Sequence, residues 1–139
     1  MHSFRLVIPR EIYDALVQHA QAELPAECCG LLAGTIVDGI GRVTTHLPLV
    51  NSLRSPTQYE SDAKSMLAAH KAMRASGTEV LAVYHSHPMS DPIPSVRDRE
   101  RNFSEQVVNL IVGLKGDAPN VRGWWLTATS AREAEWVIE

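Results

Sequence analysis

The chain has 139 residues and a mass of 15.3 kDa, which is enough for one domain with a hydrophobic core. Hydrophobic residues make up 45% and charged residues 21%, and the net charge of -3 with a pI near 6.1 provides no basic surface for nucleic acid. No apolar run approaches the roughly 20 residues of a membrane span, and the N-terminus has no signal-peptide pattern.

The N-terminal third predicts a strand, a helix and a β-hairpin. Residues 4–8 read as a strand, and the spacing of apolar residues predicts a helix over residues 9–24, opened by a proline. The run from Cys28 to Val37 is apolar with two glycine interruptions, so we expect a buried strand there. Asp38-Gly39 is a typical hairpin turn, and residues 41–50 would form the partner strand.

The middle of the chain predicts a polar loop, a helix and a second apolar strand. The loop covers residues 51–56, and Asp62 is a candidate N-cap for a helix that runs to Arg74. Residues 79–87 read as a strand, because their first six positions are rich in apolar, β-prone side chains. Four side chains would share the core-facing side of the helix: Met66, Leu67, His70 and Met73.

The last third predicts a short helix and three strands. The helix covers residues 95–102, a β-branched strand covers 107–114, and residues 121–129 and 133–138 would close the sheet as a pair. The resulting order, β-α-β-β-α-β-α-β-β-β, indicates an α/β fold with a mixed sheet and helices packed against it. We expect a single domain over residues 1–139.

The only two cysteines, Cys28 and Cys29, are adjacent in the sequence. Neighbouring cysteines rarely form a disulfide, so free thiols in a reducing compartment are expected. This indicates a cytoplasmic protein.

The strongest candidate for a functional site is a His-Ser-His-Pro stretch. His85 and His87 end a predicted strand, and residues two apart on a strand project from the same face. The two imidazoles would therefore lie close enough to bind one ion. Pro88, Pro92 and Pro94 would stop the strand and stiffen the loop that follows. Two histidines and a carboxylate, with a fourth position left for water, are typical ligands of catalytic zinc.

Ser95 and Asp98 fit two descriptions. Ser-x-x-Asp resembles a capping box at the start of the short helix, in which the serine caps and the acid satisfies backbone amides. Asp98 could equally supply the carboxylate of a metal site, and a capped helix start would hold that carboxylate rigidly. Glu27 lies far away in the sequence, and local spacing does not distinguish it from a solvated loop residue such as Glu23.

The sequence lacks the patterns of several other hydrolases. It contains neither the His-Glu-x-x-His helix of one metalloprotease class nor the His-x-Glu and Pro-Cys-x-x-Cys pair of zinc deaminases. It also lacks a Gly-x-Ser-x-Gly nucleophile elbow and a phosphate-binding glycine loop.

The spacing around the two histidines resembles the signature of the JAMM (MPN+) zinc metalloproteases. His85-Ser86-His87-Pro88 is followed by Ser95 after seven residues from His87, and by Asp98 after two more. Residues 25–34, which read Pro-Ala-Glu-Cys-Cys-Gly-Leu-Leu-Ala-Gly, resemble the family's upstream glutamate segment, with Glu27 at the matching position. Further matching segments extend the resemblance over nearly the whole chain: Asn51, Pro56, Tyr59 and residues 108–114.

The resemblance implies a role for each of these residues. His85, His87 and Asp98 would bind Zn²⁺, with water as the fourth ligand. Glu27 would take a proton from that water as general base and deliver it to the leaving amine, and Ser95 would stabilise the oxyanion. The implied fold is a single MPN (JAB)-type domain, a mixed curved sheet flanked by about three helices with cytidine-deaminase-like layering.

The resemblance also bears on the substrate. The loops at residues 51–58 and 115–120 are short, whereas the large JAMM deubiquitinases carry insertions that bind ubiquitin, so this chain is similar to the minimal prokaryotic form. Relatives of that form act at the Gly-Gly C-terminus of ubiquitin-like sulfur-carrier proteins, releasing an extension or a cysteine adduct. We therefore expect a zinc metallopeptidase or isopeptidase for such a tail, which would bind by strand addition beside the metal strand.

Two alternatives remain. Some MPN domains act only as scaffolds or interaction domains, although that role normally goes with lost ligands and none is lost here. A RadC-like or phage-tail JAB-type peptidase shares the His-x-His-Pro motif and a nearby Asp-Pro, as at Asp91-Pro92. RadC relatives tend to carry Asn at the position of Ser86 and an added DNA-binding segment, and this chain has neither.

Overall fold

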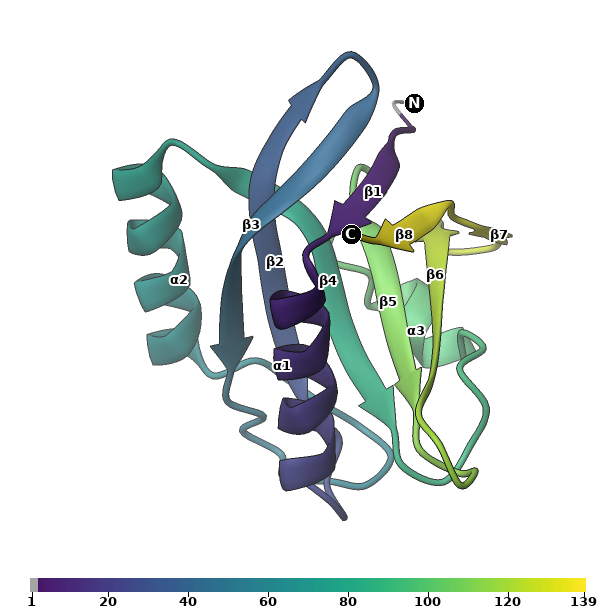
Figure 1. Ribbon diagram of the computed structural model, residues 1–139. Coiled ribbons are helices and arrows are strands. Elements are labelled where there is room, and N and C mark those ends of the chain that lie inside the picture. Colours follow the sequence, from purple (N-terminus) through teal and green to yellow (C-terminus); the bar gives the residue numbers. More distant parts are fainter. Residues whose placement is uncertain (1–2) are drawn as a thin grey trace.

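In a computed structural model, residues 3–139 form an eight-stranded mixed sheet with three helices (Figure 1). In chain order the elements are β1 (Arg5–Ile8), α1 (Arg10–Ala22), β2 (Cys29–Val37), β3 (Ile40–Leu49), α2 (Ala63–Ser76), β4 (Glu79–His87), α3 (Val96–Glu100), β5 (Val108–Gly113), β6 (Asn120–Leu126), β7 (Ala131–Glu133) and β8 (Trp136–Ile138). The strand order across the sheet is β7-β6-β5-β4-β2-β3-β1-β8, with parallel and antiparallel pairs. The predicted α/β fold with a curved mixed sheet is confirmed.

Helices α1 and α2 pack on two separate apolar clusters of this sheet. Leu16 and Ala20 of α1 are buried in the larger cluster, which includes residues of β1, β2, β4 and β5. Ala69 and Met73 of α2 are buried in the smaller cluster, with residues of β2, β3 and β4. No helix within residues 3–139 combines the length and the apolar character needed to cross a bilayer.

The central strand β4 sends alternate side chains to the two clusters. Tyr84 packs in the α1 cluster and Val83 in the α2 cluster. Because successive side chains of a strand point to opposite faces, His85 and His87 project toward the α2 side, and Ser86 toward the α1 side. All of β4 from position 81 onward is buried, so the two histidines lie at the end of the best-protected strand.

Two histidine side chains hold the hydroxyl of Tyr84 on the α1 side of the sheet. The hydroxyl lies 2.6 Å from His19 Nδ1 and 2.6 Å from His46 Nε2, so it donates to one ring and accepts from the other. Burial lowers the pKa of His46 to about 4, and both partners therefore stay neutral near pH 7. Gly30 pairs with Tyr84 across the sheet, and a Cβ at Gly30 would overlap the tyrosine ring.

The predicted core face of α2 is partly wrong. Leu67 is 56% exposed and His70 is exposed, whereas the side of α2 that faces the sheet carries Met66, Ala69 and Met73. These three lie at i, i+3 and i+7, a narrow stripe that suits a helix with one apolar contact surface. The start of α2 is as expected, because the Asp62 carboxylate caps it by accepting from Ser65 N–H, and the helix continues past Arg74 to Ser76.

The predicted closing pair of strands is only partly right. Of the expected strand over residues 133–138, Glu133 ends the short strand β7 and pairs with Trp124 of β6, whereas residues 136–138 form a separate strand, β8. Strand β8 pairs in parallel with β1 at the other edge of the sheet. The reason is the curl of the sheet: Ala134 N–H donates to Gly123 of β6, and the next residue, Glu135, accepts from Leu6 of β1. A two-residue crossing is therefore enough to reach the opposite edge.

Candidate metal centre

Three side chains from β4 and α3 converge on one point. His85 Nε2 lies 3.2 Å from His87 Nε2 and 3.2 Å from Asp98 Oδ1, and His87 Nε2 lies 3.1 Å from Asp98 Oδ2. The histidines are buried, and the Asp98 side chain is only 9% exposed. The structure thus brings together the three residues that were predicted from the sequence to be metal ligands.

These distances suit a tetrahedral cation. Zinc bonds of ~2.0–2.1 Å to nitrogen and oxygen place neighbouring ligand atoms about 3.3 Å apart, close to the separations in the trio. His87 Nδ1 is 2.8 Å from the carbonyl oxygen of Asp91, so Nδ1 carries the proton and donates it there. With Nδ1 protonated, a neutral His87 would direct the lone pair of Nε2 at the Asp98 carboxylate, so this contact needs either a second proton on Nε2 or a cation between the two groups.

The pKa values of Asp98 and His87 are shifted in the directions that favour an ionised carboxylate and a charged imidazole. Burial alone would raise the pKa of Asp98, but hydrogen bonds from His85 and His87 outweigh it and hold that pKa well below its usual range. Burial alone would lower the pKa of His87, yet its bonds to Asp98 and to the Asp91 carbonyl raise it above the ordinary value. The site is therefore built to keep the carboxylate ionised and to hold positive charge.

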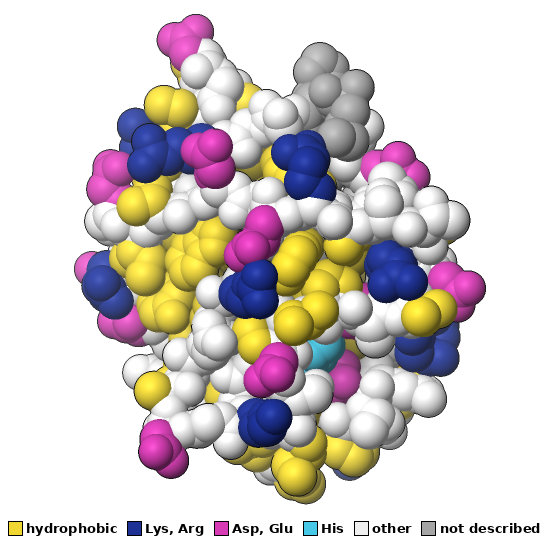
Figure 2. Space-filling view, turned by 90° about the vertical axis from the view of Figure 1, so that its right-hand side faces the viewer, with side chains coloured by type: hydrophobic (Ala, Val, Ile, Leu, Met, Phe, Trp, Pro, Cys, Tyr) yellow, Lys and Arg dark blue, Asp and Glu magenta, His cyan; other side chains and the backbone are white. Residues whose placement is uncertain are grey.

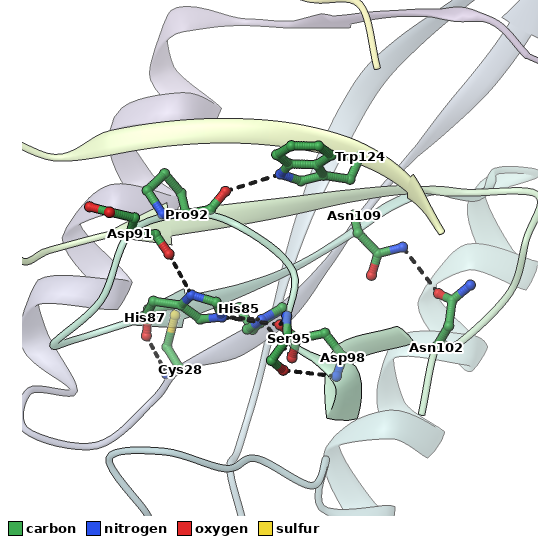
Figure 3. Close-up of polar contacts among 11 residues, drawn as sticks. Cys28, His85, His87, Asp91, Pro92, Ser95, Asp98, Asn102, Asn109 and Trp124 are labelled. Atoms are coloured by element: carbon green, nitrogen blue, oxygen red, sulfur yellow. Dashed lines mark hydrogen bonds and ion pairs between the residues drawn. The ribbon is translucent and has the colours of Figure 1, made fainter. Parts of the chain in front are cut away.

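Ser95 and Asp98 form the predicted capping box. Asp98 N–H donates to Ser95 Oγ at 3.0 Å, and Ser95 N–H donates to Asp98 Oδ2 at 2.9 Å. The cap uses the serine oxygen as an acceptor, so its own O–H remains able to donate toward the site. One motif thus both starts α3 and orients the carboxylate (Figure 3).

The proline loop between the histidines and Asp98 is anchored from β6. Trp124 Nε1–H donates to the carbonyl of Pro92 at 3.0 Å, next to the Asp91 carbonyl that orients His87 (Figure 3). Pro92 in turn lies over Gly113 of β5, where a Cβ would come within 2.8 Å of the proline ring. A tryptophan distant in sequence therefore holds the residue next to the carbonyl that sets the tautomer of a candidate ligand.

A second polar contact holds the far end of α3. Asn109 of β5 is buried and donates to Asn102 Oδ1 at 3.1 Å, and Asn102 donates to the carbonyl of Leu126 at 2.9 Å. The five-residue helix is thereby tied to β5 and β6 just beyond its C-terminus.

Glu27 lies just before β2 and is buried, with 6% of its surface exposed. Its backbone is held on both sides, because Glu27 N–H donates to Ser55 O at 2.8 Å and Asn51 Nδ2 donates to Glu27 O at 3.0 Å. Burial raises the pKa of Glu27 to about 7, against the opposing influence of His87. A carboxyl group with that pKa can both accept and release a proton near neutral pH.

Cys28, the residue before β2, is hydrogen-bonded to Ser86 near the end of β4. Cys28 N–H donates to Ser86 Oγ at 2.8 Å, and Ser86 N–H donates to Cys28 O at 3.3 Å. This pair fixes Glu27 relative to the histidines that flank Ser86.

The thiols of Cys28 and Cys29 are free and buried, and burial raises the pKa of each to about 12, so both stay protonated.

Asn51 connects Glu27 to the loop after β3. Besides Glu27 O, its amide donates to Gln58 O at 3.1 Å, and its Oδ1 accepts from Leu53 N–H and Glu60 N–H, each at 3.1 Å. The buried amide thus makes four hydrogen bonds, and its bonding capacity is filled.

A pocket of about 170 Å³ begins at Glu27 and Asp98 and runs between β2, α2 and α3. Its apolar wall includes Leu31, Leu49, Met66, Val83 and Phe103, and its polar rim includes Glu60, Arg97 and Arg101. Tyr59 also lines it and stacks on His85, with ring centroids 4.8 Å apart. Figure 2 shows a small area of histidine surface beside acidic surface on the face that carries α3 and β6.

Several of these contributors have no local signal in the sequence. Asn51 and Tyr59 stand out only through the family resemblance, and nothing marks Arg97 or Trp124 before the fold is known. The expected strand addition cannot use β4 itself, because β4 is hydrogen-bonded to β2 on one side and to β5 on the other.

Comparisons with known proteins agree with this architecture. The family described as prokaryotic homologs of the JAB domain matches residues 9–127. The desampylase of Haloferax volcanii is 38% identical over 122 residues, which cover 84% of this chain and 86% of that protein. The CysO-cysteine peptidase of Mycobacterium tuberculosis is 38% identical over 93 residues, covering 67% of this chain and 62% of that protein. A solution structure of a Desulfitobacterium hafniense protein superimposes with a TM-score of 0.87 at 28% identity, covering 96% of this chain and 92% of that one.

Proposed function

The chain belongs to the family of prokaryotic homologs of the JAB domain, and from this we propose that it is a zinc-dependent peptidase. Its substrate would be a ubiquitin-like sulfur-carrier protein, cut at an amide bond that follows the C-terminal Gly-Gly tail. The observation that carries the proposal is the convergence of His85, His87 and Asp98 on one point, with Asp98 lining the same pocket as the buried Glu27. The names of the similar desampylase and CysO-cysteine peptidase support the same substrate class.

His85, His87 and Asp98 would hold the Zn²⁺ in this proposal. When bound, the ion would polarise the scissile carbonyl and make a water molecule acidic enough to act as a nucleophile near pH 7. His87 is oriented for this task by the Asp91 carbonyl, and His85 by its stacking on Tyr59. His85 Nδ1 has no hydrogen-bond partner within residues 3–139, so the ring is oriented by the stacking contact and by the contacts of its Nε2 atom.

Glu27 would move the proton. Its carboxylate would take a proton from the attacking water as the water oxygen bonds to the carbonyl carbon. It would then give that proton to the leaving nitrogen as the C–N bond breaks, leaving a carboxylate on the carrier and a free amine. Ser95 O–H would donate to the developing oxyanion, a contribution on the order of 3 kcal/mol in comparable sites.

We place the reaction in the cytoplasm, because the two cysteines are unpaired and buried and nothing in the fold depends on a disulfide. The partner is the carrier protein itself. Its tail would approach through the face shown in Figure 2 and thread to the trio at the end of β4.

Zinc content and cleavage, measured on the same preparations, test the proposal. We expect about one zinc per native chain, and loss of that zinc in His87→Ala and Asp98→Ala. Glu27→Ala should keep its zinc and lose cleavage of a carrier fused after its Gly-Gly tail. His70→Ala, which removes an exposed histidine of α2, is the matched control and should keep both. A native chain without zinc under replete conditions, or full activity in Glu27→Ala, would contradict the proposal.

A further inference from the structure

The pocket beside the metal centre contains a cationic group that the proposed chemistry does not use. Arg97 lies between Val96 and Asp98 on α3 and lines the pocket that also contains Glu27. Its side chain is half-buried, and within residues 3–139 it makes no ion pair with any carboxylate. Arg101 differs, because it is exposed and lies 3.9 Å from Glu60.

An unpaired guanidinium in a partly buried pocket is a binding group for an anion. Arg presents a planar fork of N–H donors that matches a carboxylate in two parallel hydrogen bonds. The charge of Arg97 is felt at Glu27, where it opposes the larger effect of burial on the pKa of that carboxyl. Arg97 and Glu27 line the same pocket, so the guanidinium lies on the side of the site where the proton would be delivered.

The leaving group must lie on the same side. Glu27 would protonate the leaving nitrogen, so the residue that departs occupies the end of the pocket that Glu27 lines. In a residue joined through its α-amine, the carboxylate is separated from that nitrogen by one carbon only. In a lysine isopeptide, four methylene groups separate the nitrogen from the backbone, and no carboxylate comes near.

We propose that Arg97 binds the free α-carboxylate of the residue being released. The enzyme would then favour tails that end in one extra amino acid over lysine isopeptides. The apolar wall formed by Leu31, Leu49 and Val83 would take the side chain of the released residue. This inference rests on the proposed function, since it names the substrate of the same site.

Binding to a zinc-loaded Glu27→Gln protein tests the inference without requiring cleavage. The probe is a fluorescein-labelled sulfur carrier ending in Gly-Gly-Ala, prepared as the free acid and as the C-terminal amide. We expect the acid to bind about 10- to 100-fold more tightly than the amide, and Arg97→Gln to remove that difference. Arg97→Lys should restore part of it, and Arg74→Gln on the exposed surface of α2 should leave it intact.

The other outcomes would overturn the inference. Equal binding of acid and amide, or binding of neither, means that Arg97 does not recognise the carboxylate. An equal loss of binding for both probes in Arg97→Gln means that the residue acts through the shape or charge of the pocket. Cleavage by the native enzyme is measured separately, so a failure of the proposed function appears there and not in the difference between the two probes.

Discussion

Asn51 offers a direct measurement of how firmly the fold holds Glu27. The change Asn51→Asp is nearly isosteric and keeps the oxygen that accepts from Leu53 N–H and Glu60 N–H. It removes both donors, so the carbonyl oxygens of Glu27 and Gln58 face a carboxylate oxygen in place of an N–H group.

The expected loss of unfolding free energy follows from the two hydrogen bonds that Asn51→Asp removes. Leaving a buried polar group without its partner costs about 1–3 kcal/mol, so two carbonyls lower the unfolding free energy by roughly 2–6 kcal/mol at pH 7. For a chain of this size that corresponds to a fall in Tm of about 7–20 °C. The loss should shrink in acid, because a protonated carboxyl can again donate one hydrogen bond.

Urea unfolding at pH 7 and pH 4, with activity and zinc content on the same samples, checks this reasoning. Asn51→Asp should keep its zinc and show a lower kcat, because the backbone of Glu27 is loosened while the trio is untouched. Asn120→Asp, at the exposed start of β6, is the matched control and should unfold like the native chain. A difference between Asn51→Asp and native protein of less than about 0.5 kcal/mol would refute the argument, since water would then replace the amide.

Three further changes probe other parts of the site. Gly30→Ala should lower the unfolding free energy by about 2–3 kcal/mol, because its Cβ overlaps the buried Tyr84 ring; Gly116→Ala in an open loop should have little effect in the same denaturation series. Trp124→Phe should weaken zinc affinity about 10-fold in a chelator competition by releasing Pro92 O, and an unchanged affinity would show that the proline loop holds itself. In metal-free protein, Glu27→Gln should be more stable than the native chain above pH 7, by about 3 kcal/mol at most, and equal to it below pH 4.5. The sign follows because the folded carboxyl, with its pKa raised from 4.5 to about 7, binds protons that the unfolded one has already released. A stability difference that grows toward acid would contradict the assignment of burial as the cause.

The sequence predicted most of this fold because its local signals agree with its tertiary contacts. The Asp38-Gly39 turn, with both residues at positive φ, joins two strands whose register it determines. Asp62 and Ser95 cap the helices that they were expected to cap. The His-x-His spacing on a buried strand was enough to place two imidazoles side by side.

The errors arose where curvature and burial decide the outcome. Strand β8 reaches β1 because the curled sheet brings its edges together, and no local pattern encodes that distance. His70 was expected near the core because its spacing fits, but α2 buries only a narrow stripe. Arg97 and Trp124 act through residues far away in the chain, so their contributions become visible only when α3 and β6 lie against the proline loop.

The candidate ligands belong to parts of the molecule with very different local stability. His85 and His87 end a strand that is paired on both sides in the middle of the sheet, whereas Asp98 lies on a five-residue helix with no buried residue. A bound ion would therefore link α3 and the loop before it to β4, and local opening of that surface segment would require loss of a metal bond. On removal of the ion, amide hydrogens of residues 88–101 should exchange with solvent far faster, while those of β4 stay protected. The metal would then govern when the ligand loop opens, and with it how easily a protease or a competing chelator can reach the site.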